Sequence, residues 1–542
     1  MYLPVTINSW LLAFLPLLVL LFLMLAKKWG AAEAGPIAWL VSIGTAWFYF
    51  EAPAEAIGFE SVKGAWSAVT VLYVVWASIL IYEVTHEGGA FDPLRRGITR
   101  VMPDPRLQVL AFGWAFSSFL QGVTGFGVPI AVCAPLLVGI GVRPLYAVVI
   151  PLIGHAWNNT FGTLSLAWLG LKQVAAMEPA LAAETALYAS AFIWILNIIG
   201  GFLICWLCGR FRGIWHGLPA ILVISTIHGG LSLVLSQWND VLNGFIASGV
   251  AFIAVFCLAY LPCYRRPKSS GLRVFQEESG GDGAPVRPAA AGSTVGAMAV
   301  EKDMTLHQAF IPYYALLVMT FGILLVPSVY DALNSYSFGL GFPATVTGLG
   351  FERHATTSSM APFTHAGTFL LASAVVGYFA FNSMGGMRKG SIRRILHNTV
   401  DKSIPSTIAV VSLIATSNVM AGSGSVEVLA HGVADATGEG FGFLAPLVGG
   451  LGSFMTTSNL ASNLLFGTFQ SSTAEATALL KSAILGAQTA GGAVGTMIAP
   501  AKVLLGTTTA GILGQEGNVL RITIPLFLLV SFIIGIVVFL VA

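Results

Sequence analysis

Charge is scarce in this 542-residue chain. Asp, Glu, Lys and Arg make up only 9% of it, against roughly 25% in a typical soluble domain. Hydrophobic residues make up 56%, so an ordinary water-soluble globular protein is excluded. The formal net charge of +2 is too small to suggest a partner among the nucleic acids.

Cysteine and catalytic motifs are also scarce. Five cysteines cannot form a disulfide framework, and the C-x-x-C of Cys205 and Cys208 lies in an apolar stretch without a second pair. Packing is therefore favoured over metal or redox use. The chain has no nucleotide-binding loop, no H-E-x-x-H and no convincing Ser/His/Asp set. We expect no enzyme, no cofactor and no bound metal.

Long apolar runs dominate what is present. Each is about 20 residues long, enough to cross a hydrocarbon core of about 30 Å. The pattern predicts an all-α polytopic membrane protein with about 12 transmembrane helices and two re-entrant hairpins. The predicted spans are 9–26, 31–50, 64–83, 144–168, 186–209, 216–235, 241–264, 308–330, 365–383, 404–429, 482–500 and 522–541. The first is not a secretory signal, because no basic residue precedes it and no small-residue cleavage site follows it.

The positions of Lys and Arg predict the orientation. Basic residues follow every second span, and the positive-inside rule places these loops in the cytoplasm. Both termini then face outward. The residues concerned are Lys27, Lys28, Arg95, Arg96, Arg100, Arg106, Arg210, Arg212, Arg265, Arg266, Lys268, Arg273, Arg287, Lys302, Arg388, Lys389, Arg393, Arg394 and Lys402.

This orientation implies an internal repeat. Segment 107–141 starts and ends inside, and segment 441–470 starts and ends outside, so two hairpins should enter from opposite faces. That is the arrangement of an inverted-topology repeat, whose interface holds the binding site in many transporters. We therefore expect transmembrane halves at 1–264 and 306–542, joined by a flexible cytoplasmic linker at 265–305.

Polar residues and glycines interrupt both hairpins and predict a binding site for a small solute. Irregular backbone inside a membrane is tolerated only where protein or a water-filled cavity satisfies it. The alternative is helix packing, in which small and hydroxyl residues line close contacts. The predicted substrate-binding residues are Gln121, Gly122, Thr124, Gly125 and Gly127 in the first hairpin, and Thr457, Ser458, Asn459, Ser462 and Asn463 in the second.

Two further polar stretches lie at matching places in the halves. His155, Asn158 and Asn159 lie in span 144–168, and Gln488 and Thr489 lie in span 482–500; all five are predicted to line the substrate site.

Among the ionisable residues, His155 is predicted to carry a coupled proton, with a neutral core histidine as an equal alternative. For Glu427 an interfacial position is favoured over a coupling role. For Lys502, extension toward the membrane surface is favoured over attraction of an anion.

Three motifs resemble the lactate permease family. They are Gly125-Phe126-Gly127-Val128-Pro129 with the following Gly-Val-Arg-Pro-Leu of 141–145, the stretch PLVGGLGSFMTTSNLASNLLFGTFQ of 446–470, and AGGAVGTMIAP of 490–500. The chain is identified as a divergent member. The resemblance implies a secondary transporter that takes up a small organic acid such as lactate or glycolate, with H⁺ as the coupled ion.

The chain departs from the family pattern at three positions. Gln121 and Asn459 stand where the family usually has acids, and Thr496 stands where a lysine is common. The loss of two acids gives weight to an alternative, a transporter of another small organic anion coupled to Na⁺, because carbonyl and hydroxyl groups can hold a cation without an acid. An anion channel is less favoured, since a continuous polar pore lining is missing. The lipid bilayer is an expected partner, and a homodimer is possible.

Overall fold

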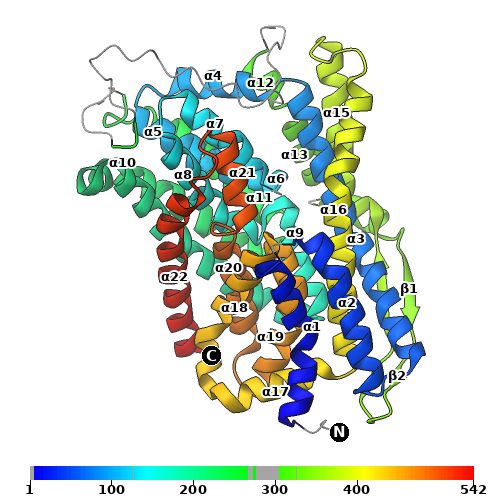
Figure 1. Cartoon of the computed structure of the whole chain (residues 1–542). Coiled ribbons are helices and arrows are strands. Elements are labelled where there is room, and N and C mark those ends of the chain that lie inside the picture. The colour runs from blue at the N-terminus through cyan, green and yellow to red at the C-terminus, as the bar shows by residue number, and fades with distance from the viewer. Residues whose placement is uncertain (1–4, 28, 126, 266–272, 276–303, 325) are drawn as a thin grey trace.

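The computed structural model describes residues 5–27, 29–125, 127–265, 273–275, 304–324 and 326–542. Most of the predicted linker 265–305 therefore lies outside the described residues. Helices make up most of the chain (Figure 1). Those of the first half are α1 (Ile7–Leu25), α2 (Ala31–Phe48), α3 (Ala54–Glu87), α4 (Phe91–Val101), α5 (Pro105–Leu110), the π-helical η1 (Ala111–Phe116), α6 (Ser117–Val123), α7 (Val128–Gly139), α8 (Pro144–Ala156), the 3₁₀ turn η2 (Trp157–Asn159), α9 (Gly162–Val174), α10 (Pro179–Trp238) and α11 (Asn243–Leu258).

The second half has a similar number of elements and the only strands among the described residues. Its elements are α12 (Leu306–Ala309), α13 (Ile311–Leu324), α14 (Pro327–Asn334), β1 (Phe338–Phe342), β2 (Thr345–Val346), β3 (Glu352–Arg353), β4 (Thr356–Met360), η3 (Pro362–Thr364), α15 (Ala366–Ser383), α16 (Ser391–Gly422), α17 (Ser425–Thr437), η4 (Gly438–Gly440), α18 (Phe441–Thr456), α19 (Asn459–Ala476), α20 (Lys481–Gly495), α21 (Pro500–Thr509) and α22 (Glu516–Val541).

The expectation of an all-α chain was wrong at one place. Strand β1 pairs antiparallel with β4, and β2 pairs with β3, between α14 and α15. The inner turn uses Gly350 at φ +80°, a conformation that favours glycine. Trp66 of α3 donates a hydrogen bond to the Ser358 carbonyl over 2.9 Å, which fixes the ribbon to the end of α3. The apolar runs of the sequence did not predict this ribbon, because it is short and rich in Thr, Ser and Gly.

Long apolar helices confirm a multi-pass membrane protein. Six described helices are long and apolar enough to cross a membrane, namely α1, α3, α10, α15, α16 and α22, and α13 with α14 makes a seventh if the bent pair counts as one. The remaining helices are shorter or less apolar, so the count of about twelve spans stays a prediction. Many apolar side chains face outward, such as Val318 at 72% exposure, as expected for a surface in contact with lipid.

Several predicted spans have different bounds in the structure. Spans 186–209 and 216–235 are one helix, α10, bent at Gly209 and Arg210, where φ reaches +52° at Arg210. Span 404–429 is divided between α16 and α17 because Gly424 takes φ +78°. Span 308–330 ends with α13, since Pro327 begins a new helix, α14. Spans 144–168 and 482–500 are each broken, which matters for the site described below.

A scaffold of α2, α3, α15 and α16 flanks the site (Figure 1). Helices α3 and α16 pack against each other along most of their length. Two ion pairs connect them at one end. Glu83 pairs with Lys402 and also accepts a hydrogen bond from Asn398 over 3.0 Å, while Glu87 pairs with Arg394. Glu83 is buried, so its charge is compensated inside the helix pair rather than by solvent.

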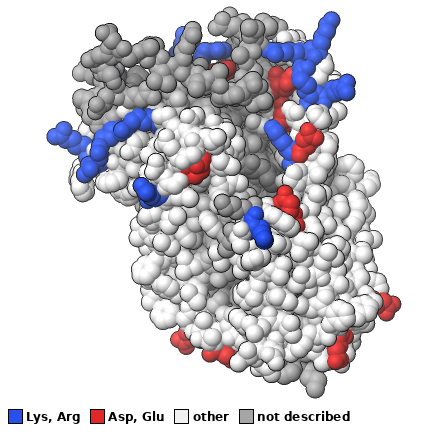
Figure 2. All heavy atoms as spheres, in the orientation of Figure 1, with Lys and Arg blue, Asp and Glu red and all other residues white. Residues whose placement is uncertain are grey.

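Basic side chains gather at one end of the molecule. Figure 2 shows Lys and Arg at the end that carries α4 and α12, while the opposite end in this view shows acidic side chains and no basic ones. The turn between α15 and α16, which the sequence placed in the cytoplasm, lies at the basic end (Figure 1). The distribution agrees with the expected orientation.

Candidate functional site

Two helix-turn-helix units are each followed by a helix that is broken midway. In the first half, α5 to α6 turns back through α7, and the next helix is interrupted between α8 and α9. In the second half, α18 turns back through α19, and the next helix is interrupted between α20 and α21. We call these units hairpin 1 (105–139) and hairpin 2 (441–476). Figure 1 places hairpin 1 toward the basic end and α18 and α19 toward the other.

The first break has three consecutive non-glycine residues in the left-handed region. Thr163, Leu164 and Ser165 have φ of +51°, +50° and +61°. Such a conformation costs roughly 1–2 kcal/mol per residue and persists only where the surroundings hold it. The Trp168 amide closes this loop by donating to the Thr160 carbonyl over 3.1 Å. The Ser165 amide likewise donates to the Phe161 carbonyl over 3.1 Å, so the carbonyls of Thr160 and Phe161 are paired across the break.

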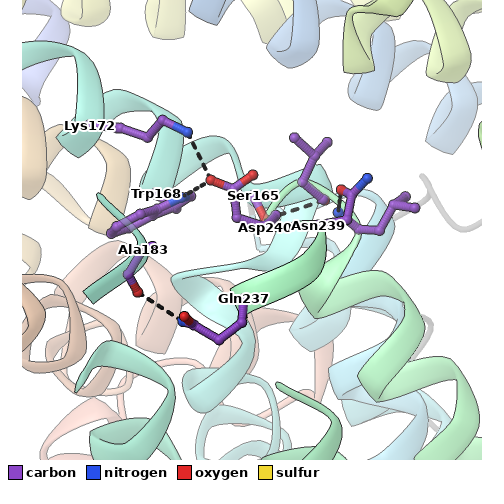
Figure 3. A network of polar contacts seen from close by, with 9 residues as sticks. Ser165, Trp168, Lys172, Ala183, Gln237, Asn239 and Asp240 are labelled. Carbon is purple, nitrogen blue, oxygen red and sulfur yellow. Dashed lines mark hydrogen bonds and ion pairs between the residues drawn. The ribbon is translucent and has the colours of Figure 1, made fainter. Parts of the chain in front are cut away.

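A polar network at the end of α10 holds this strained turn (Figure 3). Asp240 receives hydrogen bonds from Trp168 Nε1 over 2.7 Å and from Lys172 Nζ over 2.9 Å. The Ser165 hydroxyl donates to the Asp240 carbonyl. The sequence analysis missed this network. The sequence did contain a signal for it: Lys172 follows the apolar span 144–168, and Asp240 follows the span 216–235.

The two breaks meet at Lys502. Its Nζ lies 3.2 Å from His155 Nε2 and 3.4 Å from Asn159 Oδ1. Asn159 Nδ2 donates in turn to Thr496 Oγ1 over 3.0 Å, which ties the break after α8 to the break before α21. Lys502 is buried at 7% exposure, so the prediction that it extends toward the membrane surface was wrong. In the sequence Lys502 follows Pro500 at the end of a predicted span, which suggests a position at the membrane surface. The break between α20 and α21 instead turns its side chain inward.

Geometry assigns the tautomer of His155. Its Nδ1 lies 2.8 Å from the Pro151 carbonyl, and a carbonyl oxygen only accepts, so Nδ1 carries the hydrogen. Pro151 lies four residues earlier on α8. In a neutral ring Nε2 then has a free lone pair, and it faces the ammonium group of Lys502. His155 is buried and contacts the only buried lysine among the described residues.

The tip of hairpin 2 lies against both broken helices. Asn459 Nδ2 donates to the Thr489 carbonyl over 3.1 Å and to Thr160 Oγ1 over 3.3 Å. Asn463, one turn further along α19, donates to Thr489 Oγ1 over 2.9 Å. Thr457 takes φ +61° to make the turn, and Ser458 caps α19 by accepting from the Ala461 amide over 3.4 Å. These contacts bring three of the predicted residues, Asn459, Asn463 and Thr489, to one place.

Two oxygens at this tip have no partner among the described residues. They are Asn459 Oδ1 and Ser453 Oγ, both buried. A Cβ atom built on Gly492 would lie 2.0 Å from the first and 3.2 Å from the second, so the two oxygens lie close together beside α20. A buried polar atom without a partner costs about 1–3 kcal/mol. A group that donates hydrogen bonds to these two oxygens would remove this cost.

The tip of hairpin 1 lies against the first break. Thr163 Oγ1 donates to the Gln121 carbonyl over 3.4 Å, and Gln121 Oε1 is buried without a partner. Gly125 and Gly127 have φ of +61° and +84°, and a Cβ on Gly125 would lie 2.3 Å from Thr163 Oγ1. The hydroxyl of Thr124 donates to the Leu120 carbonyl of its own helix over 2.8 Å, so it is already satisfied.

Asn158 has a structural role at the same place. Its Nδ2 donates to the carbonyls of Ser118 over 2.8 Å and Gly244 over 3.2 Å. A Cβ on Gly122 would lie 3.2 Å from this nitrogen, so the glycine allows α6 to pack on α11 and the break. Asn158 thereby joins hairpin 1, the first break and α11.

Other predicted residues lie outside this meeting point. Gln488 donates to Ser462 Oγ over 3.1 Å and accepts from Gln470 over 2.9 Å, so it joins α19 to α20. Glu427 accepts from Ser472 over 3.2 Å. Ser472 is nine residues beyond Asn463 on α19, roughly 14 Å along a helix. The structure does not bring Glu427 to the other candidate residues.

Helix N-termini face the same region. Helix α7 begins directly after Gly127, and a Cβ atom added to Gly127 would lie 2.8 Å from Leu505 of α21. Helix α19 begins at Asn459, and α21 begins at Pro500. At the start of α7 the amides of Val128, Ile130 and Ala131 donate to the carbonyls of Gly125 and Gly127, so this helix has no free first-turn amide. The first amides of α19 and α21 carry partial positive charge, which favours an anion. Together with Lys502, they make the centre of the molecule positive. Among the ion pairs of the described residues, none joins Lys502 to an acid.

Comparison with known proteins agrees with these observations. A model of the L-lactate permease family matches residues 9–542. The glycolate permease GlcA of Escherichia coli K12 is 26% identical over 98% of this chain and 95% of its own length. The L-lactate permeases of Bacillus subtilis 168 (27%, covering 98% of this chain and 95% of that protein) and Halalkalibacterium halodurans (26%, covering 94% and 93%) are similarly related.

Among solved structures, the YdaH transporter of Alcanivorax borkumensis aligns over 88% of this chain and 86% of that chain, at 13% identity and a TM-score of 0.40. That score is too low for an element-by-element comparison. The family match covers almost the whole chain. The related proteins named above are permeases rather than enzymes. The resemblance inferred from the three motifs is confirmed: the chain belongs to the L-lactate permease family.

Proposed function

We propose that this protein is a secondary transporter of the bacterial inner membrane that takes up small 2-hydroxy monocarboxylates, such as lactate or glycolate, together with a proton. The observation that carries the proposal is Lys502, a buried lysine without an acidic partner among the described residues, placed where two broken helices meet. A lysine at the centre of a membrane helix costs about 2.5–3.5 kcal/mol even with relaxation. A side chain with that cost is expected to serve a function.

The carboxylate of the substrate binds at Lys502. Its ammonium group has three donor hydrogens, and the structure gives it two acceptors, His155 Nε2 and Asn159 Oδ1. A third hydrogen is therefore available for a carboxylate oxygen. The free amides at the start of α21 add partial positive charge, as in other transporters whose half-helix N-termini face anionic substrates.

The 2-hydroxyl of the substrate donates to Asn459. The Oδ1 atom of Asn459 is buried and unpaired, and its amide nitrogen is held by Thr160 and Thr489, so the oxygen has a fixed direction. Thr160 follows Asn159 in the chain, which connects this acceptor to the Lys502 group. A site that hydrogen-bonds a hydroxyl discriminates strongly against an acid that lacks one, because its own polar group is then left unpaired.

The charges around Lys502 support coupling to a proton. With the site empty, one positive charge lies beside neutral His155, and a second proton on His155 would place two cations side by side. A bound carboxylate compensates one of these charges, so substrate and proton support each other's binding. This coupling needs no acid in either hairpin, which accounts for an amide at both Gln121 and Asn459.

A sodium-coupled transporter is the second candidate. The unpaired oxygens of Asn459 and Ser453 lie close together, and Gln121 Oε1 at the other tip is also unpaired. Oxygens of this kind coordinate Na⁺ where helices are interrupted. Dependence of uptake on Na⁺ at constant pH would favour this candidate over proton coupling.

Alternating access is proposed to use the two halves as an inverted repeat, with hairpins 1 and 2 re-entering from the cytoplasm and the outside. Single cysteines introduced at Lys389 and Gly438, in a variant without the native cysteines, should react with a membrane-impermeant maleimide from opposite sides. Lys389 should be labelled only in inverted vesicles, and Gly438 only in whole cells. Labelling of both positions from one side would exclude the inverted arrangement.

The hairpin tips offer a matched pair of substitutions. Asn459→Ala removes the acceptor for the substrate hydroxyl and should weaken glycolate binding about three- to thirty-fold, since polar bonds inside a membrane are worth roughly 0.6–2 kcal/mol each. Thr124→Val removes a hydroxyl that bonds its own helix and should change affinity less than twofold. Isothermal titration of the purified proteins measures both. Equal affinities in all three proteins would place the substrate elsewhere.

A further inference from the structure

A cavity with two arginines lies at the basic end of the molecule, away from the proposed transport site. It has a volume of about 340 Å³. It lies between α8, α10 and α22, with one residue of the chain before α12. Its lining residues are Tyr146, Leu203, Trp206, Leu207, Arg273, Arg521, Ile522 and Pro525.

The cavity lies at the expected depth of lipid headgroups. Arg521 is in the second turn of α22, which starts at the basic end, and Trp206 lies three residues before the bend of α10 at Gly209. Trp206 is 39% exposed, so the cavity opens on the outer surface of the helix bundle rather than into its centre. Tryptophan is enriched at this boundary because its ring is amphipathic.

The cavity has a polar side and an apolar side. Arg273 and Arg521 provide two cations, no Asp or Glu is among the lining residues, and the ion pairs of the described residues include neither arginine. Leu203, Ile522 and Pro525 provide an apolar wall. The position of Arg273 is fixed by its backbone amide, which donates to the Cys208 carbonyl of α10 over 3.0 Å.

We infer that this cavity binds the headgroup of an anionic phospholipid from the cytoplasmic leaflet. Arginine forms paired hydrogen bonds with phosphate oxygens, and basic pockets between transmembrane helices on the cytoplasmic side suit such headgroups. The apolar wall continues toward the membrane interior and suits acyl chains. A soluble anion would use the arginines but leave that wall in contact with water.

Lipid binding here would connect α8 to α22. Tyr146 belongs to α8, the helix that carries His155 of the transport site in its last turn, and Arg143 lies over the Tyr146 ring at 5.0 Å. The lipid would thus bridge a helix of each half at the cytoplasmic end.

Native mass spectrometry of the detergent-purified full chain tests the inference. Phosphatidylglycerol should be retained more tightly than phosphatidylcholine with the same acyl chains. The double variant Arg273→Gln/Arg521→Gln should lose about 25-fold in affinity for phosphatidylglycerol, at about fivefold for each arginine. The matched control is Arg388→Gln, an exposed arginine at the same end that is not among the cavity lining and should behave as wild type.

A second measurement does not depend on the arginine variants. Phosphatidylglycerol brominated in its acyl chains should quench Trp206, so quenching should fall in Trp206→Phe. Equal retention of both lipids, an unchanged double variant, or quenching that Trp206→Phe leaves unaltered would overturn the inference. Displacement of phosphatidylglycerol by millimolar inorganic phosphate would also overturn it, because the occupant would then be a soluble anion.

Discussion

Replacing Lys502 by glutamine should abolish measurable uptake of lactate and glycolate. The substitution removes the one cation placed to bind the carboxylate, and losing one partner of a buried charge pair costs about 2–5 kcal/mol, or at least about 30-fold in affinity. Glutamine can still donate to His155 or Asn159, so both keep a possible partner. The variant should therefore fold and insert normally. Initial rates of radiolabelled glycolate uptake into proteoliposomes give the readout.

Lys481→Gln is the matched control for Lys502→Gln. Lys481 starts α20, pairs with Glu475 and lies at the far end of the same broken helix. This variant should transport as wild type, because a partly exposed ion pair contributes little. A Lys502→Gln protein that takes up substrate at the wild-type rate would show that the carboxylate binds elsewhere.

Replacing His155 by glutamine should separate transport from its driving force. Glutamine keeps an acceptor for Lys502 but cannot take up a proton, whereas a free imidazole titrates near pH 6.5. We expect exchange of internal for external substrate to continue. Accumulation driven by an acid exterior should fall to the level seen without a gradient. Counterflow and pH-jump uptake on the same proteoliposomes measure the two activities.

An Asn158→Ser variant provides a structural comparison for His155→Gln. Asn158 is as deeply buried and lies in the same break, but its amide bonds backbone carbonyls of α6 and α11 rather than Lys502. Its loss should reduce stability and both transport activities together. If His155→Gln still concentrates substrate on a pH gradient, His155 does not carry the coupled proton.

Sequence patterns predicted the polar breaks but not how they meet. The sequence alone shows glycine, amide and hydroxyl residues in the middle of apolar runs. For this reason Asn159, Asn459 and Thr489 were predicted to lie in the site. The contact between Lys502 and His155 joins residues 347 positions apart. No local pattern shows which way a lysine near a proline turns, and the inward direction depends on the break between α20 and α21.

Other differences have the same origin. Gln488 and Ser462 have the polarity of binding residues, yet tertiary packing uses them to join α19 to α20. The left-handed turn at Thr163–Ser165 has no sequence signal, since none of its residues is glycine. It exists because Asp240, from the turn after α10, bonds both Ser165 and Trp168. The short β-ribbon between α14 and α15 was missed because a hydropathy search reads it as a loop.

The most direct test of the central claim is glycolate accumulation by proteoliposomes that contain the wild-type protein. Proton and sodium gradients are imposed separately at zero membrane potential, and the internal concentration is compared with the external one. The account predicts accumulation above the external concentration when the outside is acidic, with no requirement for Na⁺. Equilibration without accumulation under either gradient, as through a channel, or accumulation that needs Na⁺ and ignores pH, would contradict proton-coupled transport.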